Sequence, residues 1–361
     1  MKLKYLKTKE DLDKFIDFAK EIYRNDPFYR DSMSSIVRMF LTGKTAYVEH
    51  AEIFPLWVEE DKEILARAAY VIDYKQKDML MISFFEAKNN AQSAVDVIIN
   101  EAESLGRKRG LKRIVIGLDA HLNYGLGFLT SHFDETPTFG LAYNPPYYPA
   151  FFTGLKVYNF TSFLTEVDSF NLEKEQTILN RIKKQGFTFR FAQLSQLDRE
   201  IEIYTYLNNE CFTNHLWWAD RTIQEDRELF SPFRWFLKGE NLIFAEKDGE
   251  PIGLMLWYPD FNQLLSPGES LGFKALIRYK LGLGKIDRFK IAEIAITEKH
   301  QGSGAVLGFF ELLYSVIKEK YKFCEAGWVL EENLNSRGLG LRWQDLGCRE
   351  YKKYQAYEVL L

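Results

Sequence analysis

Apolar and polar residues follow two different periods along the chain, and the order of these periods predicts an α/β fold. An apolar residue at every third or fourth position predicts helices, and this spacing covers 9–26, 89–110, 197–212 and 305–321. Short apolar or alternating runs predict strands. These runs lie at 1–6, 54–73, 78–87, 111–120, 185–191, 241–260, 288–297 and 322–330, where 54–73 and 241–260 each read as a hairpin. Hairpins combined with strand–helix–strand units predict a mixed sheet covered by helices.

The second half of the chain repeats the order of elements in the first half. Each half reads strand, helix, hairpin, strand, helix, strand, and VEEDKEILARAAYVI at 58–72 resembles AEKDGEPIGLMLWYP at 245–259. The dipeptide Asp248-Gly249 suits the tight turn of the second hairpin, because both residue types tolerate positive φ. We therefore predict a tandem duplication, with one domain at 1–168 and the other at 169–361.

Two glycines stand between a strand and a helix in the segment ITEKHQGSGAVLGFFELL at 296–313. Backbone N–H groups in the first turn of a helix have no intrahelical partner, and glycine lets an anionic group approach them closely. Gly302 and Gly304 therefore predict either a structural turn or a seat for a pyrophosphate. The loop is not a P-loop, and Leu307 stands where a third glycine would complete GxGxxG. The matching segment of the first half, FEAKNNAQSA at 85–94, contains no glycine.

This segment resembles the central strand, pyrophosphate loop and helix of the GNAT acyltransferases (Gcn5-related N-acetyltransferases), whose loop signature is Gln/Arg-x-x-Gly-x-Gly/Ala. Residues 301–305 fit the signature, whereas Val306 departs from its final Gly/Ala. The segments 324–361 and 142–160 resemble the closing elements of two copies of that fold. The resemblance implies two tandem GNAT-like domains of α/β (α+β) class, each a mixed, largely antiparallel twisted sheet flanked by helices. It also implies acetyl-CoA or another acyl-CoA as cofactor of the second domain, and a degenerate cofactor loop in the first.

The resemblance further implies a set of cofactor-binding residues on the central strand, in the loop and after the next strand. They are Ile294, Ile296, Gln301, Gly302, Ser303, Gly304, Ala305, Asn333 and Asn335. The two asparagines would hydrogen-bond the pantetheine arm of the cofactor or, alternatively, cap a helix.

Glu293 is a carboxylate within an otherwise apolar strand. Strand alternation predicts that Ile291, Glu293 and Ala295 share one face. Burial there would raise the pKa of the Glu293 carboxyl, as a general base requires. An ion pair with Arg288 or Arg342 is the alternative role for this carboxylate.

Many GNAT enzymes use a tyrosine on the last helix as the acid that protonates the leaving thiolate. In this chain the position falls on Trp343, which cannot donate that proton. Tyr351 and Tyr354 are nearby replacements or, alternatively, structural strand aromatics. The predicted function is acyl-CoA-dependent N-acyltransfer, with acetyl transfer as the first expectation, to an unidentified small-molecule or peptide amine. The alternatives are a noncatalytic CoA-binding protein and an aminoacyl-transferring tandem enzyme.

Composition narrows the expected partners and compartment. The 361 residues carry a formal net charge of −4, which gives no overall field that would gather nucleic acid or an anionic membrane. No window is apolar over the length of a membrane span. Three cysteines without a CxxC pair and five histidines without a spaced pair predict no metal site and no disulfide framework. We expect a cytoplasmic protein that binds neither nucleic acid nor membrane.

Overall fold

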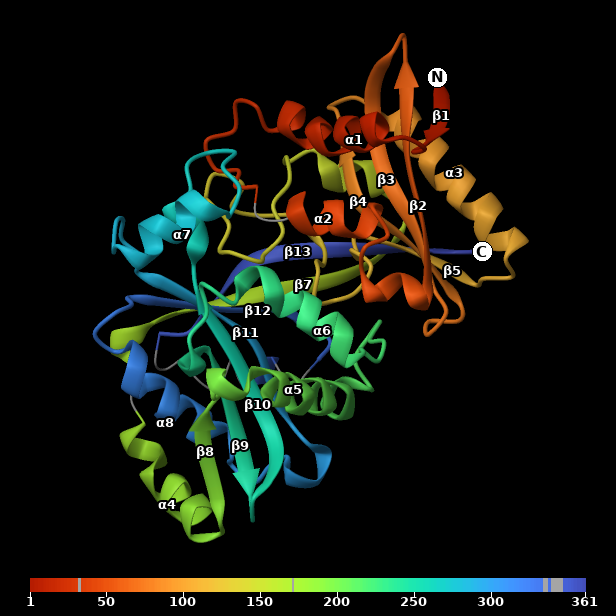
Figure 1. Ribbon diagram of the computed structural model, residues 1–361. Coiled ribbons are helices and arrows are strands. Elements are labelled where there is room, and N and C mark those ends of the chain that lie inside the picture. The colour runs from red at the N-terminus through yellow and green to blue at the C-terminus, as the bar shows by residue number, and fades with distance from the viewer. Residues whose placement is uncertain (32–33, 171, 334–336, 339–346) are drawn as a thin grey trace.

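A computed structural model describes residues 1–31, 34–170, 172–333, 337–338 and 347–361. One sheet continues from the first half of the chain into the second (Figure 1). Within the described residues it has 13 strands in the order β1-β2-β3-β4-β5-β13-β7-β12-β11-β10-β9-β8, with the short β6 paired to β13. The strands are β1 (Lys2–Tyr5), β2 (Ala51–Glu60), β3 (Glu63–Asp73), β4 (Met79–Ala87), β5 (Arg113–Ile116), β6 (Phe128–Leu129), β7 (Lys156–Glu166), β8 (Phe187–Phe191), β9 (Leu242–Lys247), β10 (Glu250–Pro259), β11 (Arg288–Ile296), β12 (Phe323–Leu330) and β13 (Arg349–Leu360). The predicted mixed sheet, largely antiparallel and flanked by helices, is confirmed.

Helices cover both faces of this sheet. In the first half, α1 and α2 pack on the face that contains Val71, whereas α3 covers the opposite face, which contains Leu80. In the second half, α5 and α6 lie on the face of Leu254, and α4 and α8 lie on the face of Met255. The α-helices are α1 (Lys9–Ile22), α2 (Ser34–Leu41), α3 (Gln92–Lys108), α4 (Gln176–Lys184), α5 (Leu197–Phe212), α6 (Ile223–Phe230), α7 (Phe273–Lys280) and α8 (Val306–Ile317). Short 3-10 helices are η1 (Ala46–Glu49), η2 (Tyr148–Phe152), η3 (Val167–Ser169), η4 (Glu173–Glu175), η5 (Leu194–Gln196), η6 (Ser231–Phe233), η7 (Gly239–Asn241), η8 (Phe261–Leu264) and η9 (Glu298–His300).

Two features are absent from the described residues. No helix there combines the length and the apolar character needed to cross a bilayer. No group of three or more His, Cys, Asp or Glu side chains in that part of the chain is placed to hold a metal ion.

The last strand of each half completes the sheet of the other half. β13, at the C-terminus, pairs antiparallel with β5 through Tyr357 and Ile116. β7, which ends the first half, pairs antiparallel with β12 through Thr165 and Cys324, and β7 and β13 also pair with each other. The domain boundary between 168 and 169 stays a prediction, but each half relies on a strand supplied by the other.

The pairing of both parallel strand pairs stops before the carboxyl end of the longer strand. β4 and β5 stay paired as far as Ile82 and Ile116, and β11 and β12 stay paired as far as Ile291 and Ala326. Beyond these positions the ladders end, although the Gly117 N–H still donates to the Ile82 carbonyl at 3.4 Å. The two openings lie at the carboxyl ends of the strands, where open α/β sheets place their ligands.

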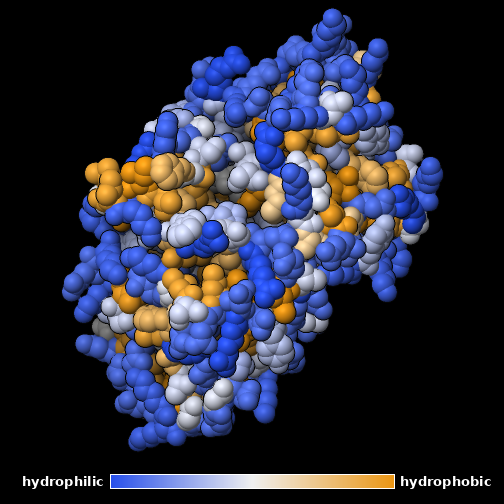
Figure 2. Space-filling model, in the orientation of Figure 1, coloured by the Kyte–Doolittle hydropathy of each residue, from blue (hydrophilic) through white to orange (hydrophobic). Residues whose placement is uncertain are grey.

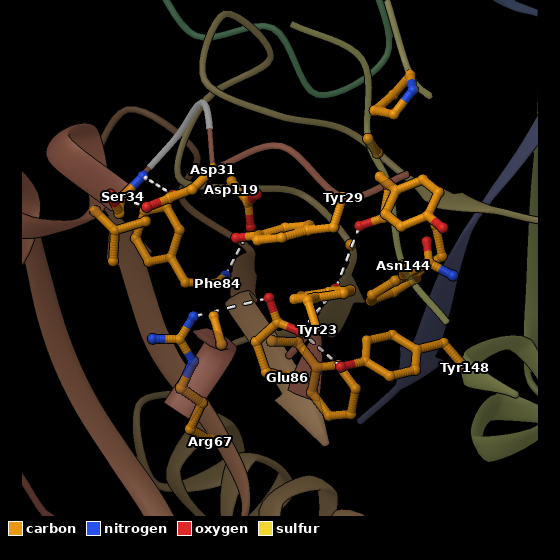
Figure 3. Close-up of a pocket in the computed structure, with 18 of the residues that line it drawn as sticks. Tyr23, Tyr29, Asp31, Ser34, Arg67, Phe84, Glu86, Asp119, Asn144 and Tyr148 are labelled. Atoms are coloured by element: carbon orange, nitrogen blue, oxygen red, sulfur yellow. Dashed lines mark hydrogen bonds and ion pairs between the residues drawn. The ribbon is translucent and has the colours of Figure 1, made fainter. Parts of the chain in front are cut away.

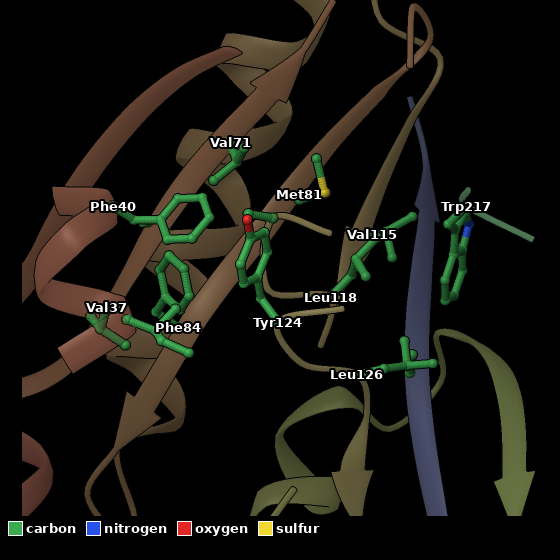
Figure 4. Close-up of a cluster of buried hydrophobic side chains, with 14 of the residues drawn as sticks. Val37, Phe40, Val71, Met81, Phe84, Val115, Leu118, Tyr124, Leu126 and Trp217 are labelled. Carbon is green, nitrogen blue, oxygen red and sulfur yellow. The ribbon is translucent and has the colours of Figure 1, made fainter. Parts of the chain in front are cut away.

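A core of aromatic and aliphatic side chains crosses the junction of the two halves (Figure 4). Trp217 belongs to the second half, yet its ring centre lies 4.8 Å from that of Tyr158 on β7. It is part of the same buried cluster as Phe40, Phe84 and Tyr124 of the first half. The two halves therefore share one core at this junction.

Candidate functional site

The predicted pyrophosphate loop forms the turn between β11 and α8. Gly302 and Gly304 both adopt positive φ, at 72° and 91°. Within the described residues their backbone N–H groups donate to no protein acceptor, and α8 starts at Val306 without a side-chain cap. The Ala305 N–H donates to the Ser303 hydroxyl at 3.1 Å. The loop therefore keeps free donors at the positive end of a helix, which suits a phosphate group.

Helix α4 covers one side of this loop. A Cβ atom on Gly304 would lie 2.6 Å from Ile178 Cγ2, so packing as well as backbone angle requires glycine there, whereas Gly302 has open space beside it. Arg181 of α4 donates to the Ser303 carbonyl at 3.2 Å. Its exposed guanidinium places a cation beside the free N–H groups. Arg181 could not be identified from the sequence, because α4 lies far from the loop along the chain.

The other predicted cofactor residues flank the loop. Gln301 donates from Nε2 to the Ile296 carbonyl at 3.3 Å. Ile294 and Ile296 are partly buried against the core that contains α8. Asn333 follows the end of β12, and Asn335 lies outside the described residues.

A β-bulge interrupts the strand that carries Glu293. β10 and β11 change register between Ile291 and Glu293, so Ala292 is the extra residue. The predicted shared face is therefore wrong for Ile291, whereas Glu293 and Ala295 lie on the same face, as predicted. Ile291 packs with α4 and α8, whereas Ala295 packs with α5, and Glu293 also reaches α5 through a hydrogen bond to Tyr204.

Burial raises the pKa of Glu293 to about 7, which confirms the predicted direction. The Tyr204 hydroxyl lies 2.8 Å from both carboxylate oxygens and donates to the carboxylate, and Asn123 Nδ2 donates to Oε1 at 3.4 Å. Hydrogen bonds of this kind favour the charged form, so the loss of hydration is the larger effect. A carboxyl with a pKa near neutrality can accept a proton at physiological pH.

The alternative role of Glu293, an ion pair, is not found within the described residues. Arg288 instead approaches Glu325, with Nη1 3.7 Å from Oε2, and Arg342 lies outside the described residues. Burial outweighs the nearby positive charge of Arg221, so the pKa of Glu293 rises instead of falling.

A buried lysine lies on the same strand as Glu293. Burial lowers the pKa of Lys290 to about 8. Its Nζ donates to the Gly140 carbonyl at 2.9 Å and lies 5.7 Å from the ring centre of Trp328 on β12. β11 therefore carries a carboxyl and an amine that both titrate close to neutral pH, and such a pair can supply a base and an acid.

The two predicted acid tyrosines lie on β13, away from Glu293. β7 and β12 stand between β13 and β11, which at a strand spacing of about 4.8 Å separates the two strands by roughly 14 Å. Tyr351 donates its hydroxyl to Glu135, and Tyr354 is buried in the core of the first half. Their role as acids stays a prediction, and Trp343 lies outside the described residues.

The first half holds a cavity of about 160 Å³ at the opening between β4 and β5 (Figure 3). Glu86 lies in its wall and accepts hydrogen bonds from the Tyr23 and Tyr148 hydroxyls at 3.0 and 2.6 Å. Arg67 Nη2 lies 3.8 Å from the other oxygen of Glu86. The ring of Tyr29 stacks on that of Tyr23, with centres 3.8 Å apart. No sequence motif had pointed to this cavity.

Asp119 adds a second carboxyl to the cavity. Burial raises its pKa to about 6, and the Phe84 N–H donates to Oδ1 at 2.6 Å. At the end of β4 the Tyr147 hydroxyl donates to the Ala87 carbonyl at 2.9 Å. Carboxyls and aromatic rings around a small cavity suit a polar or cationic molecule more than a pyrophosphate.

Comparison with known proteins adds to this geometry. No protein-family model matches the chain. The fold is similar to that of a tandem GNAT protein from the clavulanic acid biosynthesis pathway, with a TM-score of 0.55 and 11% identity over 99% of this chain and 98% of that one. A GCN5-related N-acetyltransferase from Sphaerobacter thermophilus gives a TM-score of 0.51 and 11% identity over 99% and 95% of the two chains.

The chain has a GNAT-like fold. This confirms the fold that the loop resemblance implied. In sequence, the chain is 23% identical over 379 residues to a bacterial ceramide synthase from Caulobacter vibrioides (strain NA1000 / CB15N), covering 99% of this chain and 96% of that protein. The free N–H groups of Gly302 and Gly304, with Arg181 beside them, have the charge and the donors that a pyrophosphate requires.

Proposed function

We propose that this protein is an acyl-CoA-dependent N-acyltransferase whose catalytic site lies in the second half. The observation that carries the proposal is the loop at 301–305, where free N–H groups at the start of α8 follow directly on the strand that bears Glu293. In this proposal the loop and Arg181 hold the pyrophosphate of acetyl-CoA or of a longer acyl-CoA. The cofactor supplies the acyl group as an activated thioester.

Glu293 is the proton acceptor in this proposal. An amine is largely protonated at neutral pH, so it reacts in its neutral form after the ammonium proton has passed to solvent, and its nitrogen then loses one further proton as the amide bond forms. Glu293, with a pKa of about 7, takes that proton directly or through one water, and the hydroxyl of Tyr204 orients the carboxylate. As the carbon–sulfur bond breaks, Lys290, with a pKa of about 8, is the group on β11 that can return a proton to the sulfur. The products are an amide and a free thiol.

The acceptor amine is proposed to carry a long alkyl chain. Ceramides are amides, and the whole-chain similarity to a ceramide synthase at 23% identity favours an acceptor and a bond of that class. The test combines acyl-CoAs from acetyl to palmitoyl with a panel of amines that includes long-chain amino alcohols. We expect thiol release that depends on the amine and is fastest with the long-chain acceptors. Equal rates with short polar amines would contradict the long-chain acceptor.

A noncatalytic ligand-binding protein is the second candidate, and the first-half cavity is the observation that favours it. Glu86 and Asp119 line that cavity together with tyrosine rings. Calorimetric binding of a small amine that Asp119→Asn weakens, with no thiol released from any acyl-CoA, would favour this candidate over the enzyme.

Charge reversal at Arg181 is expected to weaken CoA binding. Arg181→Glu places an anion beside the loop without changing the backbone of Gly302 or Gly304, so the dissociation constant should rise by at least about fivefold at low salt and by less at 0.5 M salt. Isothermal titration calorimetry with CoA measures the change. Lys184→Glu is the matched control, because it makes the same charge change on an exposed position of the same helix. Equal weakening by both variants would show that only the net charge matters.

The rate of acyl transfer is expected to fall on the acid side of neutrality. Glu293 must be deprotonated to accept a proton, so below its pKa of about 7 kcat/KM should drop roughly tenfold per pH unit. Initial rates between pH 5.5 and 9 at subsaturating amine, compared for amines of different pKa, separate the enzyme group from the amine. A profile that follows only the pKa of the amine would remove Glu293 from the mechanism.

A further inference from the structure

Helix α7 carries apolar side chains on two opposite faces. Its inner face, through Leu276 and Tyr279, packs against a small buried cluster. On its outer face Phe273 is 76% exposed and Ile277 is 40% exposed, and Leu281, just after the helix, is 67% exposed. Residues four apart lie on the same side of a helix, so these three form one ridge. An apolar helix face is normally buried, but nothing in the described chain covers this ridge.

The ridge continues into the loop that follows α7, where Leu283 is 54% exposed. We call Phe273, Ile277, Leu281 and Leu283 the α7 patch. Figure 2 shows a projecting group of hydrophobic side chains at the left edge of the molecule, in the place where Figure 1 draws α7. Contiguous exposed apolar side chains of this kind mark interaction surfaces.

Cations surround the α7 patch. The segment GFKALIRYKLGLGK at 272–285 contains four Lys or Arg residues and no Asp or Glu, in a chain with a net charge of −4. Two of the four, Arg278 and Lys285, pair with acidic residues outside this segment. Lys274 and Lys280 are exposed and form no salt bridge within the described residues, although the charge of Lys274 contributes to lowering the pKa of Glu269. The surface therefore combines apolar side chains with two exposed lysines that form no salt bridge within the described residues.

We propose that the α7 patch docks this protein onto an anionic phospholipid membrane. Phe273, Leu281 and their neighbours enter the boundary between headgroups and acyl chains, while Lys274 and Lys280 contact the phosphates. Charge complementarity selects this partner, because a bilayer offers an apolar layer directly beneath a continuous anionic surface. The expectation of no membrane partner rested on the net charge of the whole chain, and the charge of this segment has the opposite sign.

Docking through α7 also brings the first-half cavity toward the lipid. Gly268, which precedes α7, donates its N–H to the Tyr29 carbonyl at 2.9 Å, and the Ser270 hydroxyl donates to Asp31 at 2.7 Å. Tyr29 and Asp31 both line the cavity. The membrane-docking proposal does not depend on the acyltransferase proposal, since it concerns binding alone.

Co-sedimentation of the full chain with vesicles tests the proposal. One set of vesicles contains phosphatidylcholine alone. In the other set about 30% of the lipid is phosphatidylglycerol, which is anionic. We expect binding to the anionic vesicles, weaker binding in 0.5 M salt, and little binding to phosphatidylcholine alone. Phe273→Glu combined with Leu281→Glu should lower the partition coefficient by more than about tenfold, because it removes apolar contacts and adds repelled charge. Lys274→Gln combined with Lys280→Gln should lower it about fivefold for each lysine.

Matched controls keep the result interpretable. Tyr206→Glu combined with Leu194→Glu replaces apolar residues of similar exposure, 57% and 48%, away from α7, and should leave binding unchanged. Thermal melting of every variant confirms that it is folded. Absence of binding to anionic vesicles, or equal loss in the control variant, overturns the proposal. A dimer of the parent protein that Phe273→Glu/Leu281→Glu dissolves would also overturn it, by assigning the patch to a second copy of the chain.

Discussion

Replacement of Glu293 by glutamine is expected to slow acyl transfer by about 10²- to 10⁴-fold, the usual contribution of a general base. Glutamine keeps the size of the side chain and can still bond the Tyr204 hydroxyl, but it cannot accept a proton. The CoA dissociation constant should stay unchanged, because the loop at 301–305 is untouched. Single-turnover thiol release at saturating acyl-CoA and amine measures the loss.

The free energy of unfolding of Glu293→Gln shows whether a loss of rate could come from misfolding. The pKa of Glu293 is raised from 4.5 to about 7 in the folded protein, so the folded state binds more protons than the unfolded state between these values. The free energy of unfolding of the parent therefore falls as pH rises through this window. That of Glu293→Gln does not fall for this reason, because glutamine has no charge to bury. Glu293→Gln should thus be at least as stable as the parent at pH 8. An unchanged rate in the folded variant would exclude Glu293 as the base.

Removal of the Asp226 carboxylate is expected to cost about 3–5 kcal/mol of folding free energy. Asp226 accepts from Arg221 Nε at 2.6 Å and from the Thr205 hydroxyl at 2.7 Å, and the side chains of Asp226 and Arg221 are both 0% exposed. Asp226→Ala leaves the guanidinium of Arg221 buried and without its carboxylate. Arg221 also donates to the Tyr124 hydroxyl of the first half at 3.2 Å, so the loss should weaken the junction of the halves.

Urea unfolding followed by circular dichroism measures this loss. Glu103→Ala is the control, since Glu103 forms an i,i+4 pair with Arg107 on the surface of α3, and such pairs contribute about 0.5 kcal/mol or less. If Asp226→Ala costs no more than Glu103→Ala, the buried pair does not stabilise the junction.

Local sequence patterns correctly predicted the turns and loops whose conformation is fixed by a few adjacent residues. The hairpin turn at Asp248 and Gly249 forms as expected, with φ of 53° and 86°, because only a few residue types tolerate those angles. The loop at Gly302 and Gly304 follows from the same restriction. The fold class was therefore accessible from periodicity, turn chemistry and the loop resemblance.

Contacts between segments that are distant in the chain could not be predicted from the sequence. Tyr204 contacts Glu293 from α5, and Arg181 contacts the loop at 301–305 from α4. No local sequence pattern indicates either contact. The bulge at Ala292 reverses strand alternation at the position where the face of Glu293 had been inferred. The two halves each supply a strand, β7 or β13, to the sheet of the other half, and this arrangement depends on which sheet edges meet. It places Tyr351 and Tyr354 on β13, with two strands between them and the strand of Glu293.

Hydrogen–deuterium exchange with and without saturating CoA tests the central claim most directly, because it locates the cofactor on the chain. The free N–H groups of Gly302 and Gly304 become hydrogen-bonded to phosphate in the proposed complex. We predict slower exchange in peptides that cover 301–308, and no change in the matching first-half segment at 88–94. Protection at 88–94 without protection at 301–308, or no protection anywhere at saturating CoA, would contradict the assignment of the acyl-CoA site to the second half.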